Sequence, residues 1–203
     1  MLNKLLSGVC AGILIAVGGT VYLSCDNKYI GAVLFTVALL CICLKGYSLF
    51  TGKIGFIPEK HGKEDLSALF LGLLGNAAAC VICGLLLSAA LPHIASAARE
   101  ACAAKLSQTF YSTLIRSIFC GIIMYLAVSI YRDKGKIVGI LFCIPVFILS
   151  GFEHSIADMF YFSLSGAPSL RVFGFLGTVL LGNSVGAVIL PILGGNLKNE
   201  KQS

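Results

Sequence analysis

The chain alternates between long apolar stretches and short segments that carry most of its charges. Runs without a charged residue occupy Leu5–Ser24, Tyr29–Leu44, Leu66–Leu91, Ser117–Tyr131, Ile137–Phe152 and Val172–Leu197. A helix that crosses the hydrocarbon core of a bilayer needs roughly 20 mostly apolar residues. The first, third and sixth runs reach that length, and the other three are shorter and interrupted by Lys45, Arg116 and Glu153. The pattern predicts one transmembrane domain over residues 1–203, with six spans at about residues 5–24, 29–50, 66–91, 108–131, 137–163 and 171–195.

Composition leads to the same class. Apolar residues make up 58% of the chain, charged residues 12%, and the mean hydropathy is +0.95. A soluble domain carries about a quarter charged residues. We therefore expect an all-α integral membrane protein in the lipid bilayer. The chain holds no redox or nucleotide motif, so neither an enzyme nor a cofactor is predicted.

The basic residues are distributed unevenly between alternate connecting segments. If the N-terminus is cytoplasmic, the outer segments hold only Lys28, Arg99, Lys105 and Arg171, and the inner segments hold Lys4, Lys53, Lys60, Lys63, Arg132, Lys134, Lys136, Lys198 and Lys201. This asymmetry favours cytoplasmic N- and C-termini under the positive-inside rule. The net charge of +6 thus reflects topology, and no basic-aromatic motif predicts a nucleic-acid partner.

The nine cysteines do not indicate a metal site. The pairs Cys41 with Cys43 and Cys80 with Cys83 have tempting spacings, but an odd number of cysteines cannot pair completely within one chain. Most of them lie in apolar spans, where cysteine behaves as a small hydrophobic residue. No metal ligand is predicted.

Three ionisable residues stand within the predicted fifth span. Glu153 and His154 are adjacent, and Asp158 follows four residues after His154. Such groups are costly in hydrocarbon and usually mark an ion or proton pathway. Histidine titrates near about pH 6.5, so His154 can exchange a proton with a weak acid. Glu153 is either a proton partner of His154 or a brace for a helix break, and Asp158 is either paired or turned away from the pathway.

The two halves of the chain resemble one another. Leu74-Gly75-Asn76 recurs as Leu181-Gly182-Asn183, and Ser7–Gly12 has a loose counterpart in Ser117–Gly121. Each half also has a span that we expect to break, at Leu49–Gly52 and at Gly151–Asp158. Three spans per repeat require the second copy to enter the membrane from the opposite side. The sequence therefore predicts two inverted three-helix repeats with the site between the broken helices 2 and 5.

These motifs, in this order, resemble the formate/nitrite transporter family over nearly the whole chain. The most specific is Gly151–Met159 at the break in the fifth helix. The others are Ala11-Gly12 with Gly18-Gly19, Leu49-Phe50-Thr51-Gly52, Arg116–Gly121 with Leu126-Ala127-Val128, and Leu181-Gly182-Asn183.

The resemblance implies an aquaporin-like fold of six spans and a homopentamer with one pore per protomer. It further implies passive or proton-coupled passage of small monovalent anions or weak acids, such as formate, nitrite or hydrosulfide, with protons as a second partner. The implied location is the plasma (inner) membrane of a prokaryote.

The resemblance also assigns roles to individual residues. His154 would be the central pore histidine, Thr51 would lie opposite it, and Lys105 would be a basic residue of the outer vestibule. Glu153, Gly151 and Gly52 would support the helix breaks. Apolar constrictions on either side of the histidine would come from Phe35, Leu39, Leu49, Phe50 and Phe147.

Three positions depart from the family pattern. Ser48 stands where the family commonly has Glu, Gly121 where it has a pore-facing Asn, and Asp158 where it has Asn. A non-transporting member of the family is therefore an alternative. A neutral-solute channel of the aquaporin type is disfavoured because its twin Asn-Pro-Ala motifs are absent. An intramembrane metalloenzyme is disfavoured because the other histidines, His61 and His93, fall in loops on opposite sides.

Overall fold

Every regular element that the structure describes is helical, which confirms the predicted all-α class. The computed structural model describes the backbone of residues 1–200 and the side chains of residues 1–195. In chain order the elements are α1 (Leu2–Ser24), α2 (Lys28–Lys45), α3 (Phe50–Lys53), the 3₁₀ helix η1 (Ile54–Phe56), α4 (Lys63–Ala90), α5 (Pro92–Leu106), α6 (Phe110–Lys134), α7 (Val138–Leu149), α8 (Ser155–Ser165) and α9 (Leu170–Glu200).

Five of the described helices are long and apolar enough to cross a membrane: α1, α2, α4, α6 and the Leu170–Gly195 part of α9. The predicted second and fifth spans are each divided. The second comprises α2 and the short α3, and the fifth comprises the 12-residue α7 and the 11-residue α8. Both predicted spans are thus interrupted, but the first interruption lies at residues 46–49, before most of the predicted Leu49–Gly52, and the second at residues 150–154, at the start of the predicted Gly151–Asp158. The count of six spans stays a prediction.

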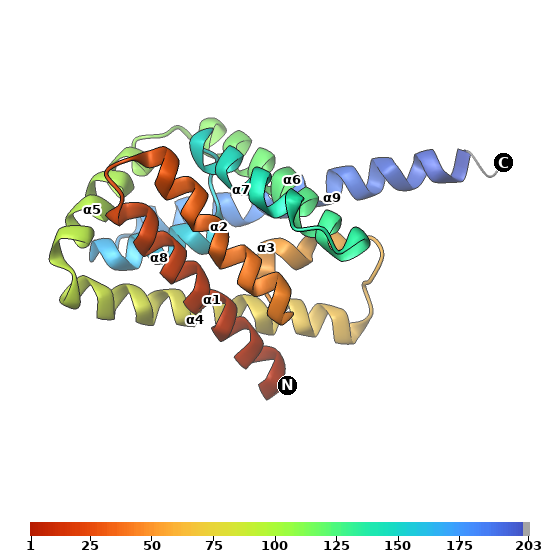
Figure 1. Ribbon diagram of the computed structural model, residues 1–203, viewed down its shortest axis with the longest axis horizontal. Coiled ribbons are helices and arrows are strands. Elements are labelled where there is room, and N and C mark those ends of the chain that lie inside the picture. Colours follow the sequence, from red (N-terminus) through yellow and green to blue (C-terminus); the bar gives the residue numbers. More distant parts are fainter. Residues whose placement is uncertain (201–203) are drawn as a thin grey trace.

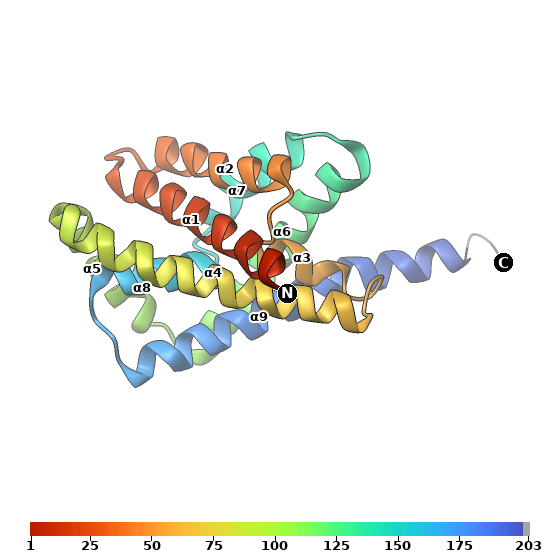
Figure 2. The same ribbon diagram turned by 90° about the horizontal axis from the view of Figure 1, so that it is seen from below.

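One helix was not expected. Residues 92–106 were predicted to connect two spans, but they form α5, which begins with Pro92 at its first helical position. Proline is well suited to that position because the first turn of a helix needs no N–H donor there. Figures 1 and 2 show α5 at one end of the bundle, while the C-terminal part of α9 extends beyond the opposite end.

Two pairs of helices pack with their backbones in close contact: α1 against α4, and α6 against α9. A Cβ atom on Gly75 would overlap the Leu5 carbonyl oxygen, and one on Gly182 would overlap the side chain of Ser117. Small residues commonly allow such close approach between helices in membranes. The glycines of the repeated Leu-Gly-Asn motifs therefore have a packing role.

A glycine in the left-handed region of backbone space stands at each interruption. Gly46 ends α2 with φ 70°, and Gly151 follows α7 with φ 68°. Residues with a Cβ rarely adopt this conformation. Gly52, by contrast, lies within α3 beyond the interruption, where its Cα faces Val128.

A buried asparagine forms hydrogen bonds with backbone groups that lack helical partners at the first interruption. Asn76 of α4 accepts a hydrogen bond from the Phe50 N–H at 2.9 Å. Its amide nitrogen donates to the carbonyl oxygens of Gly8 and Ser48, at 2.8 and 2.9 Å. Backbone that leaves a helix within a membrane must find such partners inside the protein.

The second interruption has a matching arrangement. Asn183 of α9 accepts from the Ser155 N–H at 2.8 Å and donates to the carbonyl oxygens of Ser117 and Glu153, at 2.9 and 2.8 Å. Both asparagine side chains are completely buried. The repeated Leu-Gly-Asn motifs therefore hold the two interruptions in the same way.

The outward faces of the long helices and of α7 are apolar. Exposed side chains on them include Val17, Val37, Phe70, Leu86, Phe142 and Phe173. A helix that is apolar on all sides is typical of a membrane span, because its outer face meets lipid or another apolar surface rather than water.

Candidate functional site

His154 is the residue at which the second interruption ends and α8 begins. Its Nδ1 accepts a hydrogen bond from the Ala157 N–H at 3.1 Å, so the side chain caps the helix. Since a backbone N–H only donates, this nitrogen carries no proton, and the neutral ring has its proton on Nε2. Nε2 lies 2.8 Å from Thr51 Oγ1 and therefore donates to that hydroxyl.

Thr51 reaches this histidine from the first interruption, 103 residues earlier in the chain. It lies in α3, directly after Phe50, whose N–H is held by Asn76. The side chains of both Thr51 and His154 are buried. The structure therefore brings together the two residues that the sequence predicted to face one another across the pathway, and each is held by its own asparagine-fixed break.

A cavity of about 460 Å³, here called the α5-side cavity, leads to His154 from the end of the bundle that carries α5. Its polar lining includes Lys105, Arg116, Glu153 and Asp158. The cavity joins α5 and α6 to the interruption between α7 and α8.

Lys105 is held by two carboxylates within this cavity. Its Nζ forms an ion pair with Glu153 Oε2 and a second one with Asp158 Oδ1 at 2.9 Å. Gln108 donates a hydrogen bond to Glu153 Oε1 at 2.6 Å. We call Lys105, Gln108, Glu153 and Asp158 the Lys105 cluster. If its three ionisable members are charged, the cluster carries a net charge of −1.

Two of these residues had alternative predicted roles. Among the described hydrogen bonds, the Glu153 carboxylate contacts neither backbone N–H groups nor His154, because Lys105 and Gln108 occupy it. The Glu153 backbone carbonyl, rather than its side chain, takes part in holding the break. Asp158 is paired, as one alternative required, although its Oδ2 is buried without a hydrogen-bond partner among the described residues.

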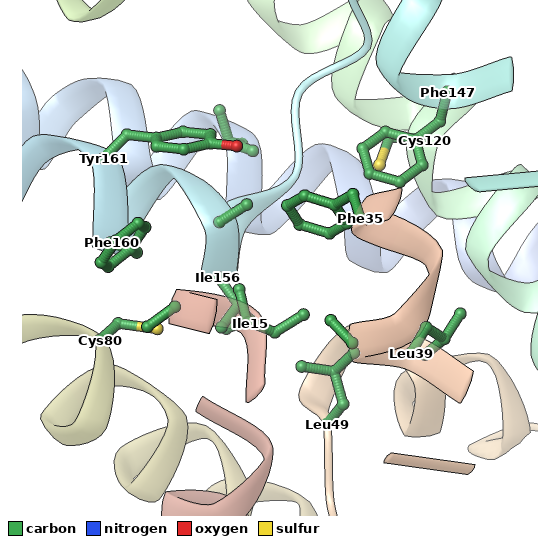
Figure 3. Close-up of a cluster of buried hydrophobic side chains, with 14 of the residues drawn as sticks. Ile15, Phe35, Leu39, Leu49, Cys80, Cys120, Phe147, Ile156, Phe160 and Tyr161 are labelled. Carbon is green, nitrogen blue, oxygen red and sulfur yellow. The ribbon is translucent and has the colours of Figure 1, made fainter. Parts of the chain in front are cut away.

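Aromatic side chains close the α5-side cavity near His154. Phe35 and Phe147 meet edge to face with ring centroids 6.3 Å apart, and the Phe147 ring lies 5.8 Å from that of His154. Figure 3 shows these two phenylalanines next to one another, with Leu39 and Leu49 in the same apolar cluster. Both phenylalanine side chains are buried.

A second cavity of about 390 Å³, the α3-side cavity, approaches from the other end of the bundle. Its lining includes Leu39, Leu49, Phe50 and Arg132. The Arg132 guanidinium lies 3.9 Å from the centre of the Phe56 ring and is paired with Glu59 at 2.9 Å. The five predicted constriction residues thus divide between the two cavities, with Phe35 and Phe147 on one side and the other three on the opposite side.

The described part of the chain offers no group of three or more His, Cys, Asp or Glu residues that could hold a metal ion. All nine cysteines are free thiols. The α5-side cavity reaches His154 of the buried histidine–threonine pair, and the α3-side cavity reaches Phe50 and Gly52, which flank Thr51.

Sequence reasoning did not assign a site role to several residues. Asn76 and Asn183 were visible only as members of a repeated motif, whose role in fixing the breaks needs the three-dimensional structure. Gln108 and the pairing of Lys105 with Asp158 had no signal in the sequence, because the partners are far apart along the chain.

Comparison with known proteins identifies the chain's relatives. A model of the formate/nitrite transporter family matches residues 1–194. "Formate-nitrite transporter 2" of Toxoplasma gondii is 32% identical over 186 residues, which cover 81% of this chain and 40% of that protein. The chain thus spans less than half the length of this relative. "Nitrite transporter NirC" of Salmonella typhimurium is 31% identical over 180 residues, covering 79% of this chain and 67% of that protein.

Solved structures show the same likeness. An "FNT family ion channel" aligns with a TM-score of 0.82 and 25% identity, covering 97% of this chain and 90% of that one. A "Pentameric formate channel with formate bound" shares the fold, with a TM-score of 0.79, 21% identity, and coverage of 98% and 97%. The resemblance predicted from the motifs is therefore confirmed, and the chain belongs to the formate/nitrite transporter family.

Proposed function

We propose that each protomer conducts small monovalent anions or their weak acids, such as formate, nitrite or hydrosulfide, across a membrane. The observation that carries this proposal is the buried His154–Thr51 pair between two cavities, with apolar side chains on both sides. The names of the relatives as formate and nitrite transporters support the same class of substrate.

The apolar constrictions favour passage with a proton. A bare ion in a medium of low dielectric constant faces a penalty of many kcal/mol, and protonation of a monovalent anion removes most of it. The anion would gather in a cavity, take up a proton and pass Phe35, Phe147, Leu39, Leu49 and Phe50 as the neutral acid.

The hydrogen bonds of His154 favour solvent as the source of that proton. With Nδ1 occupied by the Ala157 N–H, the neutral ring has only its Nε2 proton, and loss of that proton would leave an imidazolate. Nε2–H instead donates to Thr51 Oγ1, which leaves the threonine hydroxyl proton free to point at a passing solute. Thr51, held in place by His154, would thus orient the solute with its hydroxyl proton while solvent in the cavity exchanges the acid proton.

We further propose six spans in an aquaporin-like, inverted pair of three-helix repeats. Support comes from the matching hydrogen bonds of Asn76 and Asn183 and from the matched glycines Gly46 and Gly151. A homopentamer with cytoplasmic termini fits the apolar outer faces and the distribution of lysine and arginine. The relatives include proteins of protists and bacteria, so a prokaryotic inner membrane stays a prediction.

The test is uptake of formate, nitrite and hydrosulfide into proteoliposomes between about pH 5 and about pH 8, the range in which histidine titrates. We expect uptake to rise on acidification. As long as the pH is above the pKa of the acid, the share present in the neutral form rises about tenfold for each unit by which the pH falls. His154→Ala should lower the flux about fivefold at every pH, since one hydrogen bond is worth about 1 kcal/mol. His93→Ala, which removes an exposed histidine, is the matched control.

The outcomes separate the alternatives. Flux that loses its pH dependence in His154→Ala would make the histidine itself the proton donor. Passage of glycerol without any of the three anions would indicate a neutral-solute channel. No flux of any solute in wild-type protein would refute transport of these anions.

A further inference from the structure

The geometry points to Arg116, rather than Lys105, as the cation that binds the substrate anion in the α5-side cavity, with a preference for planar anions that present two oxygens. This inference rests on the proposed function, because it assigns a substrate-binding group within the same pathway. The preferred class is carboxylates and nitrite, which present two acceptor oxygens, in contrast to hydrosulfide, which presents a single acceptor atom.

Lys105 is poorly placed to collect an anion. Its ammonium group is shared between Glu153 and Asp158, and its side chain is 17% exposed, whereas those of the two acids are 3% and 1% exposed. An incoming anion would meet a cluster whose charges sum to −1 when all are ionised. Like charges at close range repel strongly in a setting of low dielectric constant. A neutral amide at position 158 would leave the cluster neutral. The carboxylate of Asp158 therefore supplies the excess negative charge that repels anions.

Arg116 lines the same cavity without such a counter-charge. It projects from α6, is exposed, and donates from Nη1 to the Gly151 carbonyl oxygen at 3.2 Å. Within the described residues it has no ion pair and no second hydrogen bond. A Cβ on Gly151 would lie 3.3 Å from Nη1, so the glycine leaves room for the guanidinium beside the break that ends at His154.

The chemistry of the free donors sets the preference. A guanidinium presents its N–H groups in a planar fork, which matches the two oxygens of a carboxylate or nitrite and binds them with parallel hydrogen bonds. One Nη1 proton is used by Gly151, and the remaining N–H groups face solvent or the cavity. Hydrosulfide, with a single acceptor atom, can use only one of them. Arg116 is therefore the group that would raise the local concentration of planar oxyanions in the α5-side cavity, next to His154.

The first test measures how uptake depends on substrate concentration. Arg116→Gln should raise the half-saturating concentration of formate and nitrite about tenfold, the value of a charge-assisted hydrogen bond, and leave the maximal rate nearly unchanged. Arg116→Lys should recover part of this loss for formate, because a lysine keeps the charge without the fork. The half-saturating concentration of hydrosulfide should change about threefold or less. Arg171→Gln removes an exposed arginine that does not line the cavity and is the control.

A second test asks whether Asp158 is the reason. Asp158→Asn removes the excess negative charge and leaves Glu153 as the single counter-charge of Lys105, so the cluster no longer repels anions. In that background Arg116→Gln should raise the half-saturating concentration of formate only about threefold, a coupling that double-mutant cycles detect. Equal effects in both backgrounds would overturn the assignment of Lys105 as neutralised.

Direct binding separates this inference from the proposed function. Broadening of the ¹³C-formate NMR signal by purified protein reports binding without transport. Broadening that Arg116→Gln abolishes, in a protein that transports no anion, would uphold Arg116 and refute the proposed function. No broadening by wild-type protein would overturn the inference. So would a lowered melting temperature and maximal rate with unchanged half-saturating concentrations, because Arg116 would then only brace Gly151.

Discussion

Replacing Asn183 by alanine tests whether the fold depends on satisfying the backbone at the second interruption. The side chain is fully buried and makes three hydrogen bonds. Ser117 lies inside α6 and keeps its helical partner, but the Ser155 N–H and the Glu153 carbonyl have no other partner among the described residues. A buried group left unsatisfied costs about 1–3 kcal/mol, so we expect Asn183→Ala to lower the free energy of unfolding by about 4 kcal/mol.

A smaller loss of stability would be expected if the hydrogen bonds of Asn183 were ordinary bonds between membrane helices. Hydrogen bonds between membrane helices are worth about 0.6 kcal/mol on average, because the separated helices find other partners. Three ordinary bonds would then amount to about 2 kcal/mol. The larger value is expected here because, among the described residues, the Ser155 N–H and the Glu153 carbonyl have no hydrogen bond within a helix that could replace those to Asn183.

The assay is denaturant-induced unfolding of the purified protein in detergent micelles, together with anion flux. Asn27→Ala is the control, since Asn27 is exposed and caps α2 with hydrogen bonds to two backbone N–H groups. Loss of such a cap costs about 1 kcal/mol. Asn76→Ala should behave like Asn183→Ala. If Asn183→Ala costs no more than Asn27→Ala, the breaks do not depend on the asparagines and the reasoning is refuted.

Two further substitutions test the packing and the site. Gly186→Ala places a Cβ against the Ile118 carbonyl and should destabilise by at least about 1–3 kcal/mol in the same unfolding assay, whereas Gly194→Ala on the same helix meets open space and should be neutral or stabilising; equal stability of the two variants would contradict the close approach of α6 and α9. Thr51→Val should lower anion flux about fivefold by removing the acceptor of the His154 Nε2–H, whereas Thr51→Ser should retain most of the flux; the reasoning is wrong if valine and serine are equivalent.

Features with a local signal could be predicted from the sequence. The apolar runs indicated membrane helices because burial in lipid constrains every residue of a span. The interruption of the second and fifth spans followed from their glycines and from the polar residues near His154, but the first interruption lies a few residues earlier than predicted. By contrast, α5 has a short, alanine-rich sequence with charges at several positions, and neither hydropathy nor charge distinguishes it from a loop.

The contacts that set the charge of the site had no local signal. Lys105 finds its carboxylates 48 and 53 residues further along the chain, and only the meeting of α5 with α8 brings them together. The sequence motif predicted Lys105 as a vestibule cation because position and residue type agree with the family. What its partners do to that positive charge depends on packing, which a motif does not contain.

The two asparagine-held interruptions also bear on how fast the pathway opens. Moving either interruption as a rigid unit would break several buried hydrogen bonds to Asn76 or Asn183 at once. Rotating the side chain of Phe35, Phe147 or Leu49 breaks none of these hydrogen bonds. Collective helix motions take microseconds to milliseconds, and side-chain rotations are orders of magnitude faster. If rotamers control access in the proposed pathway, a protomer has no need to reset between successive solutes. Single-protomer recordings should therefore show brief, independent passages without the waiting time of an alternating cycle.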